Sequence, residues 1–81
     1  MQIQLLEQYL HFVFSANQQY YRVIFELKAG NNKWSVQIID LGSNQTVYST
    51  TMDTVIVPDL QLAKEMIKTF ATRGTSPYLT H

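Results

Sequence analysis

The chain contains no cysteine, and this absence excludes several classes of small protein. A disulfide scaffold needs paired cysteines, and a zinc-thiolate module needs cysteine ligands. Neither device can stabilise this chain, so side-chain packing alone must hold the fold together. The aromatic residues, which make up 12% of the sequence, are therefore important for its stability.

Charged residues are scarce and balanced in sign. They make up 15% of the chain, against about 25% in a typical soluble domain. Six basic residues are matched by six acidic ones, so the formal net charge is zero. This balance excludes a polybasic arm that binds nucleic acid, and the 46% hydrophobic content excludes a disordered segment.

Long apolar runs are also missing. Stretches such as residues 12–14 and 55–57 are far shorter than the roughly 20 residues that cross a bilayer. The first residues lack the basic region and the continuous apolar region of a secretory signal. We therefore expect a cytoplasmic protein that does not associate with membranes.

The length of 81 residues is sufficient for one small domain with a single core. We predict one domain over residues 1–81, of which residues 75–81 form a flexible C-terminal tail. The sequence contains no internal repeat, low-complexity tract or linker that would divide this domain.

Residues 2–14 show two competing patterns. Polar side chains recur at the spacing of one helix stripe, with apolar side chains on the other side. These polar residues are Gln4, Glu7, Gln8, His11 and Ser15. The pattern predicts an amphipathic N-terminal helix. For residues 9–15 a strand is the alternative, because Leu10, Phe12 and Phe14 alternate with other residues in a composition that favours β-structure.

Three strands follow in the predicted fold. From Tyr20 to Lys28 the apolar residues alternate with polar ones, which is the clearest strand signal in the chain. Residues 29–32, which include Gly30, predict a hairpin turn to a second strand over residues 33–41. Residues 42–44 predict another turn, and residues 45–51 a third, weaker strand. The side chains expected to face the core are Tyr21, Val23, Phe25, Leu27, Trp34, Val36 and Ile38.

The remaining third of the chain predicts a C-terminal helix. Residues 55–57 form a short extended piece, a candidate fourth strand, that ends before Pro58, because proline disfavours helix in the residue before it. A helix is predicted from Pro58, with Asp59 in its first turn and Gly74 at its end. The predicted fold is therefore α+β: a three-stranded, or with residues 55–57 a four-stranded, antiparallel meander packed by an N-terminal and a C-terminal helix.

No catalytic constellation is evident. The acidic residues occur singly, and no known nucleophile or metal-ligand spacing is present. Glu7 and His11, four residues apart on the predicted first helix, could share a proton or a metal, but such a pair is ordinary on a helix surface. We assign no catalytic residue, metal site or cofactor. An enzyme that uses these two residues and a strand tyrosine stays the third hypothesis.

The outer face of the predicted sheet is the first candidate for a binding site. It combines tyrosine, arginine and isoleucine, and the first two are enriched in protein interfaces. The candidate residues are Tyr20, Arg22, Ile24, Glu26, Gln37 and Ile39. They indicate a noncatalytic module that modulates a larger protein partner, as an adaptor, inhibitor or immunity-type protein, through this face or through the predicted edge strand at residues 45–51. The low charge and the wide apolar face of the last helix, which includes Leu62 and Met66, further predict a homodimer.

The alternative function is nucleic-acid binding. The predicted element order is similar to that of double-stranded RNA-binding domains, a likeness of order alone. The basic edge of the last helix would consist of Lys64, Lys68 and Arg73, joined by Lys28 and Lys33. The neutral total charge makes nucleic acid the less favoured partner.

Overall fold

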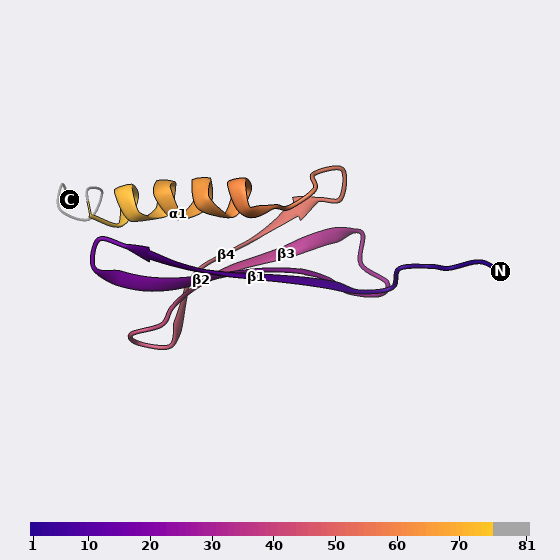
Figure 1. Ribbon diagram of the computed structural model, residues 1–81, viewed down its shortest axis with the longest axis horizontal. Helices are drawn as coiled ribbons and strands as arrows, with labels where there is room; N and C mark the ends of the chain where they lie inside the picture. Colours follow the sequence, from indigo (N-terminus) through magenta and orange to yellow (C-terminus); the bar gives the residue numbers. More distant parts are fainter. Residues whose placement is uncertain (76–81) are drawn as a thin grey trace.

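The chain forms a four-stranded antiparallel sheet followed by one helix, which packs on one face of the sheet (Figure 1). The computed structural model describes residues 1–75, and side chains as far as Ala71. The elements are β1 (Gln8–Ala16), β2 (Gln19–Leu27), β3 (Lys33–Asp40), β4 (Gln45–Asp53) and α1 (Leu60–Thr75). The α+β class and the meander are confirmed. Of the expected tail at residues 75–81, all but Thr75 lies outside the described residues.

The predicted N-terminal helix is wrong. Residues 8–16 form β1, and residues 1–7 have no regular secondary structure. The strand alternative for residues 9–15 is therefore the correct one. Its physical basis is the spacing of two between Leu10, Phe12 and Phe14, which brings all three side chains onto the core beside β2. Without the first helix, the order no longer resembles that of double-stranded RNA-binding domains.

The strands of the meander are consecutive neighbours in the order β1-β2-β3-β4. The predicted second and third strands, β3 and β4, begin at the expected residues, Lys33 and Gln45. A fourth strand exists, but it is β1, not residues 55–57. Residues 55 and 56 instead belong to a turn after β4, in which the backbone N–H of Ile56 donates to the Asp53 carbonyl at 3.1 Å.

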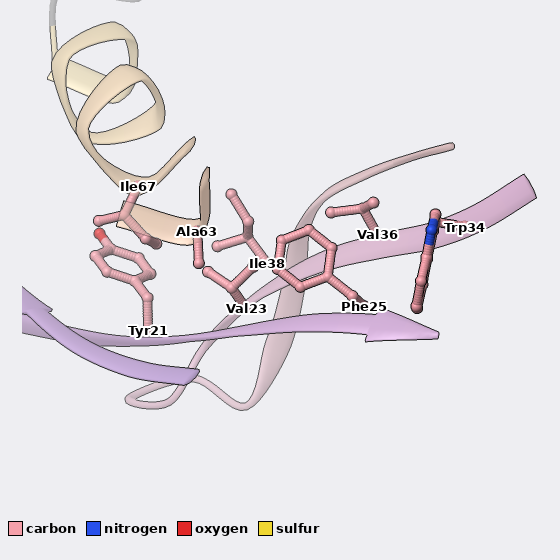
Figure 2. Close-up of a cluster of buried hydrophobic side chains, with 8 residues drawn as sticks. All are labelled: Tyr21, Val23, Phe25, Trp34, Val36, Ile38, Ala63 and Ile67. Carbon is pink, nitrogen blue, oxygen red and sulfur yellow. The ribbon is translucent and has the colours of Figure 1, made fainter. Parts of the chain in front are cut away.

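The core lies on the face of the sheet that carries α1, and Figure 2 shows its buried strand side chains in a row that begins under the helix and continues beyond it. Phe25, Val23 and Val36 are completely buried. Full burial of each such side chain contributes roughly 1.5–3 kcal/mol. The eight buried residues of this cluster are Tyr21, Val23, Phe25, Trp34, Val36, Ile38, Ala63 and Ile67. The prediction of which sheet face is buried is confirmed.

The helix covers only part of this face. It packs against β1 and β2, over the half of the sheet that ends at the β1–β2 turn (Figure 1). Figure 2 places Ala63 and Ile67 near Tyr21 and Val23, whereas Trp34 lies at the far end of the row. The other half of the face is covered by its own side chains, among which Met52 of β4 packs against the core and is paired with Trp34.

The helix begins two residues later than predicted. Pro58 is buried before it, and Asp59 is its N-cap, not a residue of the first turn. The Asp59 carboxylate accepts a hydrogen bond from the backbone N–H of Leu62 at 2.8 Å, which satisfies one of the free donors of the first turn. The helix extends through Gly74 to Thr75, so Gly74 does not end it.

The first turn generates a stability prediction. Asn17 and Gln18 have φ values of 54° and 64°, as in a two-residue type I′ hairpin, where glycine is preferred in the second position. A glutamine in this left-handed region costs about 1 kcal/mol. We expect Gln18→Gly to raise the free energy of unfolding by about 0.5–1 kcal/mol in urea denaturation. Gln19→Gly, inside β2, is the control and should lower it; a loss of stability in Gln18→Gly would contradict the turn geometry.

The N-cap generates a second prediction. Asp59→Ala should lower the free energy of unfolding by about 1 kcal/mol, because the N–H of Leu62 loses its acceptor. Asp59→Asn keeps a side-chain oxygen and should retain most of the stability. Equal losses in the two variants, measured by urea denaturation, would show that the cap geometry is not the cause.

Candidate binding face of the sheet

The face of the sheet opposite α1, here called the open face, carries the six residues predicted as a binding site. The register places Arg22 beside Ile39 and Ile24 beside Gln37 on neighbouring strands. Tyr20 and Glu26 lie at the two ends of the same row on β2, and Glu26 is paired with Ser35. In the described part of the chain, no helix covers this face. The structure thus brings together all the residues singled out from the sequence.

β1 adds side chains that sequence analysis missed. Tyr9, His11 and Val13 lie on the open face, because their neighbours Leu10, Phe12 and Phe14 point to the core. Their partners on β2 are Glu26, Ile24 and Arg22, respectively. The signal was present in the alternation of β1, but the helix prediction assigned these residues to a different surface.

The centre of the open face is apolar and closely packed. Ile24 is only 8% exposed although it lies outside the main core, between His11 on β1 and Gln37 on β3. Tyr20 at the edge of this region is 60% exposed. Ile24 and Tyr20 lie four residues apart on β2, so the open face combines a buried aliphatic residue at its centre with an accessible tyrosine at its end, and both residue types occur in protein interfaces.

Arg22 lies in this apolar region without a charged partner. Val13 is its neighbour on β1 and Ile39 its neighbour on β3. The salt bridge present on β2 joins Glu26 and Lys28 at 3.7 Å, and within residues 1–71 no salt bridge or side-chain hydrogen bond involves Arg22. Arg22 is half-buried as a residue, and its guanidinium has five donors and no acceptor, so a carboxylate of a partner is a suitable group to bind it.

Tyr9 and Tyr21 do not have the properties of catalytic bases. The Tyr9 hydroxyl donates to Glu7 Oε1 at 3.1 Å, and its pKa is raised above 10.0 by desolvation and then by Glu7. The Tyr21 hydroxyl donates to Gln19 Oε1 at 2.6 Å, and desolvation followed by the charge of Asp40 raises its pKa. Both phenols therefore stay protonated at neutral pH and act as hydrogen-bond donors.

Glu7 and His11 are not adjacent as they would be on a helix. Four residues of extended chain span about 13 Å, so the two side chains of one molecule cannot share a proton or a metal. Among the side chains described, no group of three or more potential metal ligands lies close together. The arrangement thus offers no support for the third, enzymatic hypothesis.

The predicted basic edge is divided in the structure. Lys64 and Lys68 are exposed on the side of α1 that faces the end of β1. Lys28 and Lys33 border the β2–β3 turn, at the opposite end of strands about 30 Å long. The side chain of Arg73 lies outside the described residues. The four described lysines therefore do not form one continuous surface for a phosphate backbone.

Comparison of the chain with protein-family models, with curated proteins and with solved structures gives no match. The helix formed by residues 60–75 is not long and apolar enough to cross a membrane. The residues of the open face are therefore the basis for a proposed function.

Proposed function

We propose that the chain is a noncatalytic protein-interaction module that binds a larger protein partner through the open face. The observation that carries this proposal is Arg22, unpaired among the described side chains and placed between Val13 and Ile39 on the neighbouring strands. An arginine in apolar surroundings is a typical binding hot spot when a partner supplies the carboxylate.

The chemistry of the open face defines the partner. Its complementary surface presents apolar side chains against Tyr20, Ile24 and Ile39, with an Asp or Glu carboxylate placed to receive the Arg22 guanidinium. The zero net charge of the chain adds little electrostatic attraction at long range, so the specificity comes from shape and from this one ion pair. This partner fits an adaptor, inhibitor or immunity-type role.

The experiment is affinity capture from the native host with three baits: the wild-type chain, Arg22→Glu and Lys64→Glu. The second variant makes the same charge change on α1, away from the open face. A partner of the open face is retained by wild type and Lys64→Glu and lost at least about tenfold with Arg22→Glu, because a buried like charge replaces the ion pair. Circular dichroism checks that both variants keep the fold.

Arg22→Lys sharpens the test. Lysine keeps the charge but cannot make the two parallel hydrogen bonds of a guanidinium with a carboxylate, so binding should weaken without being lost. Partners that stay bound to Arg22→Glu would contradict the proposal. If Lys64→Glu abolishes binding, and if binding weakens steeply as the salt concentration rises, the result would instead support the nucleic-acid alternative.

A further inference from the structure

We infer that two copies of this chain associate through the outer edge of β1, and that each copy places its residues 1–7, here called the arm, along β1 of the other. The resulting homodimer has one continuous sheet of eight strands. This inference uses the backbone edge of β1 and the arm, so it stands or falls independently of a partner on the open face.

The two edges of the sheet differ in their protection against pairing. β4 is interrupted by an irregularity in its register opposite Ile38 and Ile39, a feature that discourages an incoming strand. β1 pairs without interruption over nine residues and contains no proline, lysine or acidic residue. Such an edge is a ready template for another strand.

The hydrogen bonds of β2 show which backbone groups of β1 point toward the free edge. The Tyr20 carbonyl accepts a hydrogen bond from the backbone N–H of Leu41 at 2.9 Å, so the backbone N–H and C=O of Tyr20 point toward β3. The backbone groups of the residues just before and after Tyr20 therefore point toward β1. Phe14 and Ala16 on β1 are paired with these two residues, so their backbone groups point toward β2. The N–H and C=O groups of Tyr9, His11, Val13 and Ser15 point outward, available to a new strand.

The arm has the composition of an unpaired strand. It continues β1 beyond its last pair, Gln8 with Leu27, and extends away from the sheet (Figure 1). Ile3 is 90% exposed, Leu5 67% and Leu6 59%. Three exposed apolar side chains within four residues of an extended segment lose solvent-exposed area when the segment pairs with another strand.

The arm of one copy matches β1 of the other in length when the two-fold axis passes through Tyr9. Residues 2–8 of one copy then lie antiparallel to residues 10–16 of the other, and both segments contain seven residues. This register joins the outward-directed backbone groups of the two strands in hydrogen-bonded pairs. The resulting cross-strand pairs are Tyr9 with Tyr9, Glu7 with His11, Leu5 with Val13, Leu6 with Phe12, and Ile3 with Ser15.

Charge and apolar contacts select this register. Glu7 lies opposite His11, so a carboxylate meets an imidazole that can donate a hydrogen bond to it. Leu5 lies opposite Val13, whose side chain is exposed in the isolated chain. A register centred on Phe12 would leave the arm without a partner. On the helix side, a hollow of about 390 Å³ borders the end of β1 between Phe14 and Lys64, and in this register the side chains of Gln2 and Gln4 of the incoming arm lie beside it.

The first test measures the mass of the full chain by size-exclusion chromatography with light scattering at tens of micromolar. We expect twice the 9.4 kDa of one chain. Leu5→Asp should give a monomer with an unchanged circular dichroism spectrum, because the arm makes no contribution to the core. Val55→Asp, at a residue 82% exposed outside this interface, is the matched control and should stay dimeric. A wild-type monomer would overturn the inference.

Charge reversal tests the register. Glu7→Lys removes the carboxylate opposite His11 twice in the symmetric dimer and puts an ammonium group there, and it should raise the dissociation constant about tenfold. His11→Glu should weaken association similarly by opposing Glu7. The double variant restores opposite charges and should recover wild-type affinity. Failure of the double variant to recover would overturn the pairing of Glu7 with His11.

A single introduced cysteine tests the position of the two-fold axis, because the chain has none of its own. Residues in a hydrogen-bonded antiparallel pair have Cα atoms about 5.5 Å apart, within the range for a disulfide. Tyr9→Cys should therefore form a covalent dimer under mild oxidation. Val13→Cys, whose two copies would be roughly 27 Å apart, should not. Efficient crosslinking at residue 13 and not at residue 9 would overturn the register.

Discussion

One helix of sixteen residues on a four-stranded sheet is the constraint on which the rest of the structure depends. Such a helix is about 24 Å long and covers about two strands of one face. α1 covers β1 and β2 near their turn, and the core is completed by large side chains from β3 and β4, such as Trp34 and Met52. Because α1 lies on one face of the sheet and β1 has a neighbouring strand on one side only, the open face and the outer edge of β1 are accessible in the described part of the chain.

The central strands and the helix could be predicted because their signals are local. The alternation from Tyr20 onward, the turn residue Gly30 and the position of Pro58 each determine structure within a few residues. β1 could not be assigned in this way. Its polar residues fit a helical period as well as a strand, and the choice depends on pairing with β2, which buries Phe12 and Phe14 against the core.

The candidate site shows the same division. The six residues on β2 and β3 share a face because a strand alternates, so the sequence was sufficient to group them. The contribution of Val13 and His11 depends on β1 being a strand, and the isolation of Arg22 depends on which residues lie beside it in the register. The alternation of side chains along β2 and β3 therefore predicted where the site lies. The pairing of strands, which the sequence does not show directly, determines which residues surround Arg22.

The two proposed surfaces meet at β1 and affect one another. In the dimer, Leu5 of one copy lies beside Val13 of the other on the open face, and Val13 is the neighbour of Arg22. The arm thus extends the apolar surroundings of the guanidinium and lowers the local dielectric, which strengthens an ion pair with a partner carboxylate. The two-fold axis also places a second Arg22 on the same continuous sheet. A partner with two matching sites would bind both through effective concentration, without any additional contact. Dimerisation through β1 would therefore increase both the affinity of each open face and the avidity of the pair.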